Sequence, residues 1–99
     1  MIPIVPLGSA SATATTTSAP LALPASGGEL VEIANGGAVV VWANIGASNV
    51  VAVAGNLLIP AGQVRQFRLV SGNTHVALLA ASSTAVCGLT RGREQPLAG

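Results

Sequence analysis

The sequence predicts an all-β fold: a single antiparallel β-sandwich or small jelly roll of about seven or eight short strands, with an extended N-terminal arm. Short runs rich in Val, Ile and Leu recur along the chain from residue 20 onwards. Clusters of Gly, Pro, Asn and Ser separate these runs and mark turns. No window of about ten residues shows helical periodicity bounded by start and stop signals. Short strands at this spacing are typical of two packed antiparallel sheets.

The first 19 residues are expected to form the arm. Pro3 and Pro6 favour an extended backbone, and the Ser, Thr and Ala run that follows them suits an edge strand. A segment without large side chains is ordered only where it lies on something. It is therefore either a tail or a strap across a neighbouring subunit. Its start lacks a basic n-region, and the two prolines break the apolar helix of a signal peptide, so we expect it in the mature chain.

The sandwich domain is expected to span residues 20–92, with a polar tail at 93–99. Turn signals such as Asn35–Gly37 and Pro60–Gly62 divide the domain. The expected strands cover residues 21–23, 29–34, 38–45, 49–54, 64–70, 74–81 and 84–90. The two sheets must share one core, and its candidates are Leu30 or Val31, Ile33, Val39, Val41, Ile45, Val51, Val53, Phe67, Leu69, Val76, Leu78 and Val86.

The strand expected at residues 38–45, AVVVWANI, is apolar on both faces. A half-buried strand alternates apolar and polar residues, yet here one face carries Val39 and Val41 while the other carries Val40 and Trp42. We expect the Val39 face to belong to the core. The outward Trp42 face is then either a protein contact surface or a face that the N-terminal arm covers.

Charged residues are scarce. Four Arg and three Glu make the chain 7% charged, against about 25% in a typical soluble domain. Such a low number of charges protects a protein surface only weakly against association. Either small polar residues keep the protein soluble, or other subunits cover much of its surface. A net charge of +1 and few aromatic residues do not indicate binding to nucleic acid. No apolar run reaches the roughly 20 residues of a membrane helix.

Catalytic and metal-binding groups are also scarce. With one His, one Cys and no Asp, the chain does not supply a nucleophile, a base and a group that orients the base. We expect His75 to be a satisfied surface or interface residue and Cys87 to be a buried structural thiol. A zinc site needs three or four ligands, and the glycine-rich segments match no phosphate-binding fingerprint. We therefore predict a protein that is not an enzyme, with no catalytic, cofactor-binding or metal-binding residues.

The run VRQFRLV, residues 64–70, places Arg65 and Phe67 on one face of a strand and Arg68 on the other. Charge on an edge strand blocks unwanted pairing, and an arginine can equally bind the carboxylate of a partner. The sequence leaves both interpretations open. The residues predicted to contact other proteins are Ile2, Ile4, Val5, Val40, Trp42, Arg65, Phe67 and Arg68.

Two stretches of the chain, LPASGGELVEIANGGAVVVWANIG and IPAGQVRQFRLVSGNTHVALLAASSTAVCGLTRG, together resemble a group of small tailed-phage virion proteins. The shared order is a Leu-Pro lead-in, a V-x-I/V-x-N strand, a V/F-rich strand, I-P-A-G before an aromatic residue, and a closing pair of strands that begins THVA. The resemblance covers roughly residues 20–94 and leaves the arm unexplained. Ile45-Gly46-Ala47 lacks the Gly-Asp pair that such relatives often carry after the V/F strand.

Members of this group look like capsid decoration, or cement, proteins with a jelly-roll or β-sandwich fold. The resemblance implies a structural virion protein that stabilises a bacteriophage capsid by bridging subunits of the major capsid protein. It would be made in the host cytoplasm, lie on the capsid exterior and need no cofactor. We expect a homo-oligomer, with a trimer preferred over a dimer. The alternatives are a base or adaptor module of a tail fibre or head spike, which binds a partner or receptor, and a secreted, pilus-like subunit.

Overall fold

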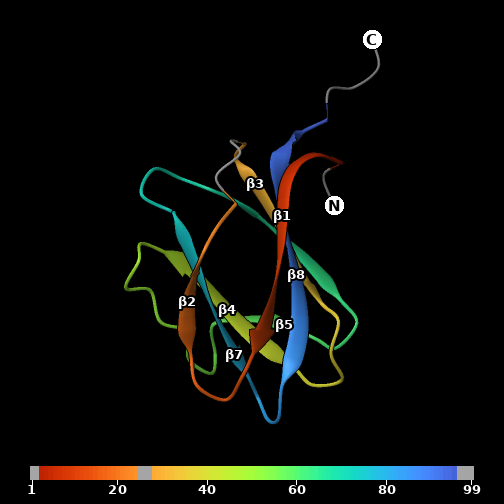
Figure 1. Cartoon of the computed structure of the whole chain (residues 1–99), viewed down its shortest axis with the longest axis vertical. Helices are drawn as coiled ribbons and strands as arrows, with labels where there is room; N and C mark the ends of the chain where they lie inside the picture. The colour runs from red at the N-terminus through yellow and green to blue at the C-terminus, as the bar shows by residue number, and fades with distance from the viewer. Residues whose placement is uncertain (1–2, 25–27, 96–99) are drawn as a thin grey trace.

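A computed structural model describes residues 3–24 and 28–95 of the chain. These residues form eight strands: β1 (Ile4–Ala14), β2 (Ala19–Ala22), β3 (Leu30–Asn35), β4 (Val41–Gly46), β5 (Leu57–Ile59), β6 (Val64–Arg68), β7 (His75–Ala80) and β8 (Ala85–Glu94). The strands form two antiparallel sheets of four, with the orders β1-β8-β3-β6 (sheet A) and β2-β7-β4-β5 (sheet B) (Figure 1). The prediction of an all-β sandwich is confirmed.

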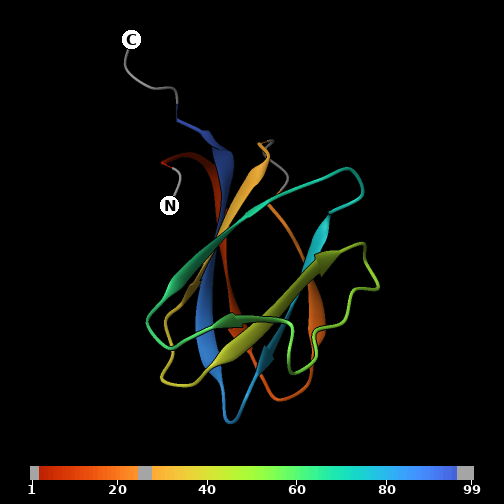
Figure 2. The same ribbon diagram turned by 180° about the vertical axis from the view of Figure 1, so that it is seen from behind.

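The strand order is that of a jelly roll. Strands pair from the two ends of the chain inwards, β1 with β8, β2 with β7, β3 with β6 and β4 with β5. The chain is thus a long antiparallel hairpin, rolled up so that successive pairs fall in opposite sheets. Each sheet has two edges, which leaves the sandwich with two open sides. Figure 1 looks onto the side where β1 and β2 lie, and Figure 2 shows β5 and β6 on the opposite side.

The N-terminal segment departs from the expected arm. Residues 4–14 are extended, as predicted, but they form β1 and pair with β8 of the same chain from Ile4 opposite Glu94 to Ala14 opposite Ala85. This part of the segment therefore belongs to the sandwich and does not leave it as a strap. The C-terminal boundary is corrected in the same way, because β8 continues through Arg93 to Glu94, where a polar tail was expected.

The core contains most of the residues predicted for it. Leu30, Val31, Ile33, Val41, Val76 and Leu78 are buried, and Val39, Ile45, Phe67 and Leu69 pack partly buried against the core cluster. Cys87 is fully buried, as expected. Three predicted core residues are exposed instead: Val51, Val53 and Val86. Val86 is exposed because it lies on the outer face of sheet A, opposite Thr13 of β1 and one residue from the buried Cys87.

The segment 49–54, expected to be a strand, is an ordered loop instead. Asn44 alternates with the buried Ala43, so its side chain lies on the outer face of sheet B, where its Nδ2 donates a hydrogen bond of 2.9 Å to the carbonyl of Val51. The next residue, Ala52, donates its backbone N–H to Ser18 Oγ at 2.9 Å. The loop therefore crosses part of the outer face of sheet B. Within the loop, Ala52 is buried, whereas Val51 and Val53 are exposed. This answers in part what covers the second face of AVVVWANI.

One buried polar side chain joins the two sheets. Asn35, at the end of β3 in sheet A, is 1% exposed. Its Nδ2 donates hydrogen bonds to the carbonyls of Val39 at 2.7 Å and of Ile59, in β5 of sheet B, at 2.9 Å. Its Oδ1 accepts a hydrogen bond from the N–H of Gly37 at 3.0 Å. The sequence identified Asn35 as the start of a turn but gave no sign of this link between sheets.

Candidate protein-contact surface

The outer face of sheet B is apolar. Trp42 lies opposite Leu58 of β5 and Leu79 of β7, so these three side chains share one face. That face points away from the core, because the neighbours of Trp42 in β4, Val41 and Ala43, are buried. Trp42 and Leu79 are partly buried, and Leu58 is 45% exposed. The prediction that Trp42 faces outward on its sheet is confirmed.

The loop over this sheet adds aliphatic surface. Val51 is 58% exposed and Val53 is 54% exposed, and Leu57 at the start of β5 is also exposed. We call Trp42, Val51, Val53, Leu58 and Leu79 together the apolar face. Exposed apolar residues that gather in one region, and do not lie singly, are characteristic of protein contact sites.

Charge is confined to the other sheet. All seven charged residues of the chain lie on or immediately beside β3, β6 and β8 of sheet A: Glu29, Glu32, Arg65, Arg68, Arg91, Arg93 and Glu94. The four strands of sheet B and the whole segment 36–63 contain none. His75, in β7, is the only titratable side chain in sheet B, and its Nδ1 lies 2.8 Å from Thr74 Oγ1. A partner of the apolar face would therefore not have to strip water from a charged side chain of that face.

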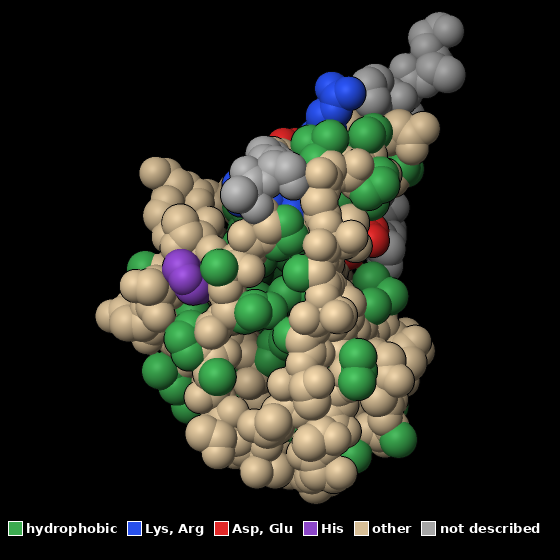
Figure 3. Space-filling model, viewed as in Figure 1, with side chains coloured by type: hydrophobic (Ala, Val, Ile, Leu, Met, Phe, Trp, Pro, Cys, Tyr) green, Lys and Arg blue, Asp and Glu red, His purple; other side chains and the backbone are tan. Residues whose placement is uncertain are grey.

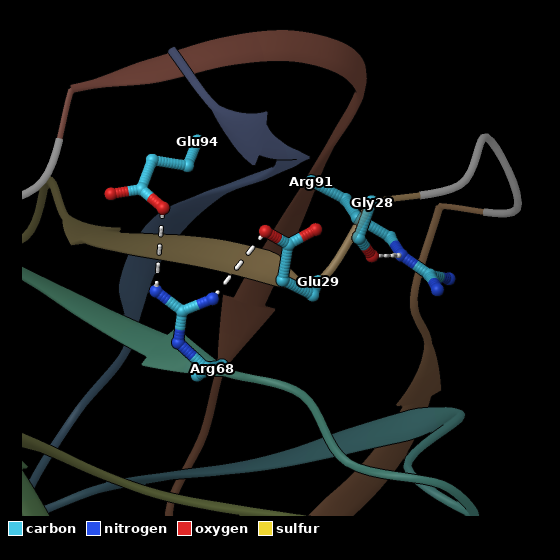
Figure 4. A network of polar contacts seen from close by, with 5 residues as sticks. All are labelled: Gly28, Glu29, Arg68, Arg91 and Glu94. Carbon is cyan, nitrogen blue, oxygen red and sulfur yellow. Dashed lines mark hydrogen bonds and ion pairs between the residues drawn. The ribbon is translucent and has the colours of Figure 1, made fainter. Parts of the chain in front are cut away.

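The two arginines singled out in the sequence have partners within the chain. Arg68 lies 3.4 Å from Glu29 and 3.9 Å from Glu94, with all three side chains about half exposed (Figure 4). Exposed pairs of this kind contribute about 0–1 kcal/mol. Arg65 donates to the carbonyl of Val64 at 3.3 Å. Both arginines lie on β6, an edge of sheet A, where charge hinders pairing with another chain.

The remaining contact candidates are dispersed. Phe67 shares the inner face of sheet A with Val31 and packs against the core, so it contributes little to the outer surface. Val40 is partly buried just before β4. Ile4 and Val5 are partly buried at the start of β1, opposite Glu94 and Arg93. Ile2 lies outside the described residues. The structure thus brings Trp42 together with leucines and valines that the sequence analysis did not select.

Both open sides of the sandwich are hollowed. The side with β5 and β6 holds a groove of about 470 Å³, whose lining residues include Phe67, Arg68 and Asn73. The side with β1 and β2 holds a less polar groove of about 300 Å³, whose lining includes Ala12, Leu21 and Leu78. Figure 3 shows this second groove as a hollow between β1 and β2, with hydrophobic side chains at its floor.

Other polar side chains serve the fold. Arg91 donates from Nε to the carbonyl of Gly28 at 3.0 Å (Figure 4) and from Nη1 to the carbonyl of Pro24 at 2.9 Å, and so links Pro24, which follows β2, to Gly28, which precedes β3. Within residues 3–24 and 28–95, no group of three or more His, Cys, Asp or Glu could hold a metal ion. The same residues contain no helix that is long and apolar enough to span a membrane.

No protein-family model and no curated protein matches this sequence.

The thiol of Cys87 is expected to be unreactive in the folded protein. Burial raises its pKa above the ordinary value, because the thiolate would lose its hydration. At pH 8 we expect an aromatic disulfide reagent to label the native protein at least about 100-fold more slowly than the protein unfolded in urea. The sign of the pH effect follows from the same raised pKa: above about pH 8.5 the unfolded thiol ionises more readily than the folded thiol, so alkali favours unfolding. Labelling of the native protein at the rate of the unfolded protein would contradict this.

Proposed function

We propose that this chain is a non-catalytic structural protein of a bacteriophage virion, which decorates the capsid exterior and stabilises it by bridging subunits of the major capsid protein. The observation that carries the proposal is the apolar face: Val51 and Val53 are exposed on the loop, Leu58 is exposed on sheet B, and the strands of that sheet contain no Arg, Lys, Asp or Glu. Burial of apolar area drives most protein association. The motif order that resembles small phage virion proteins supplies the identity of the partner.

Two further features support the proposal. A sandwich whose first and last strands pair with each other holds both ends of the fold together, which suits a protein that must hold two neighbours at a fixed separation. The jelly-roll order occurs among viral capsid proteins but also among lectins and cupins, so the fold supports the proposal by analogy alone. We propose that the protein is made in the host cytoplasm, acts as a homo-oligomer and binds neither nucleic acid nor membrane.

The proposal predicts that capsids without this protein lose resistance to heat and dilution, and that added protein restores it. Val51→Lys should weaken binding to such capsids by at least about tenfold, because the new charge must be buried in an apolar contact. Val86→Lys is the matched control, since Val86 is 59% exposed but lies on sheet A, and Val51 is 58% exposed. Binding of each variant to depleted particles is measured by co-sedimentation over a range of protein concentrations.

Unchanged robustness of the depleted capsids would overturn the proposal. Equal binding of the two variants would show that the apolar face is not the contact. The copy number per purified particle separates decoration from a tail-fibre or spike module, because decoration requires hundreds of copies and an appendage only a few.

A further inference from the structure

The edges of the two sheets differ in how well they are protected against pairing with another chain. Natural edge strands are blunted by shortness, charge, proline or bulges. Of the four edges here, β5 has three residues, β2 has four residues including Pro20, and β6 carries Arg65 and Arg68. The edge strand β1 has eleven residues and no charge. Pro6 and the irregularity between Pro6 and Gly8 protect only its first part.

The unprotected stretch of β1 is Gly8–Ala14, in regular register with β8. Its outer face carries Ser9, Ser11 and Thr13, and its inner face carries alanines. Every side chain is small, so another strand can approach closely. An edge strand presents a row of backbone N–H and C=O groups on its free side, which is a ready template for strand addition.

A second observation comes from the groove beside this edge. The groove of about 300 Å³ lies between β1 and β2 and is lined in part by Ser11, Ala12 and Thr13 of the same stretch (Figure 3). Leu21 and Leu78 give it an apolar floor. A strand added beside β1 would extend sheet A past this opening and shield the floor from water. The free edge of β1 and the groove beside it therefore both favour the addition of another strand to sheet A.

The geometry points to a second copy of this chain as the occupant: we propose that Gly8–Ala14 of two copies pair antiparallel about a two-fold axis at Ser11, which joins their A sheets into one. The stretch GSASATA is self-complementary in this arrangement. Ser9 falls opposite Thr13 of the other copy and Ala10 falls opposite its Ala12. Hydroxyl residues then meet hydroxyl residues on the outer face, and alanines meet alanines on the inner face.

The charge of the edge strand agrees with this occupant. No like charges oppose one another across the axis, because β1 is uncharged. The joined sheet places the β2 edges of both copies on its same side, so that the two grooves meet and their leucine floors are covered together. A two-fold axis makes a dimer, in place of the trimer that the sequence analysis preferred.

The test uses the isolated protein, whose mass is 9.6 kDa. Wild type at about 100 µM should sediment at twice that mass. Ser11→Lys places two lysines opposite each other at the axis and should raise the dimer dissociation constant by about a hundredfold. Ser71→Lys is the control, since Ser71 is exposed in the β6–β7 turn and should leave the dimer unchanged. An equimolar mixture of Ser11→Lys and Ser11→Glu should recover the dimer, because unlike charges then face each other.

A wild-type monomer or trimer would overturn the proposal, as would a Ser11→Lys protein that stays dimeric. Loss of the dimer without recovery in the mixture would overturn the antiparallel pairing at Ser11. Far-UV circular dichroism of each variant shows that the sheet fold persists, because Ser11 is exposed and a lysine there can extend into water. The proposal rests on the proposed function only in assuming an assembled structural protein. Its failure would show in the isolated chain, whereas failure of the proposed function would show on capsids.

Discussion

Asn35→Ala is expected to destabilise the protein by about 3 kcal/mol. The side chain of Asn35 makes three hydrogen bonds to backbone groups, and the shortest two tie the β3 end of sheet A to Val39 and to Ile59 in sheet B. Alanine leaves those groups without their partner in a region where water is scarce, and each unsatisfied buried group costs about 1–3 kcal/mol. The loss is measured from urea unfolding curves followed by Trp42 fluorescence.

Asn73→Ala is the matched control. Asn73 Oδ1 accepts one hydrogen bond of 3.0 Å from the N–H of Val70 in an exposed turn, so water can replace the lost acceptor. We expect less than about 1 kcal/mol for this variant. Asn35→Asp is expected to destabilise at neutral pH, because a carboxylate oxygen would face two carbonyl oxygens in place of the donating amide. Equal effects of alanine at positions 35 and 73 would contradict the role assigned to Asn35.

Gly92→Ala is expected to destabilise the protein by about 2–3 kcal/mol, because the added methyl group would push against the start of β1. A Cβ built on Gly92 overlaps the carbonyl oxygen of Val5 and lies 2.9 Å from Cγ1 of Ile4. The obstacle is backbone of the neighbouring strand, so a rotamer change cannot relieve it, and overpacking of this kind typically costs about 1–3 kcal/mol. Hydrogen exchange should show faster exchange at Ile4 and Val5 than in the wild type, together with a lower melting temperature.

Gly88 in the same strand provides the control. A Cβ there meets only the Cβ of Ala34, at 3.9 Å, which is ordinary contact. Alanine costs less conformational entropy than glycine on ordering in a strand, so Gly88→Ala should be neutral or stabilising by up to about 1 kcal/mol. A Gly92→Ala protein that melts with the wild type would show that β1 and β8 can separate at that point without loss.

Local pattern was sufficient to predict most strands. Alternation placed Val41 in the core and Trp42 on the outer face, and the turn expected at Pro60–Gly62 has Gly62 at the positive φ that favours glycine. Apolar content also predicted the burial of Ile33, whose side chain is fully buried. These features depend on neighbours in the sequence, which is why the sequence alone could predict them.

The errors share one cause, which is dependence on partners far away in the sequence. Residues 49–54 have the composition of a strand, but β5 pairs with β4 only along 41–43, and the side chains of Asn44 and Ser18 hold the segment across the sheet instead. Residues 91–94 are polar yet form strand, because β1 pairs with β8 as far as Glu94. Pattern cannot show where a distant strand ends.

The contact surface was predicted only in part for the same reason. Trp42 was recognisable from the unbroken apolar run in its own strand. Val51 and Leu58 lie near it because a loop and a short edge strand bring them there. The unprotected edge at Gly8–Ala14 depends on a pairing between the first and last strands that no local signal announces.

The position of β8 has a consequence for synthesis on the ribosome. This strand emerges after the other seven, yet it lies between β1 and β3 in sheet A and pairs with both. Until it leaves the exit tunnel, β1 has no strand of its own sheet to pair with, although it was made first. The nascent chain must therefore wait in a partly assembled form, and the fold closes only after translation has passed residue 94.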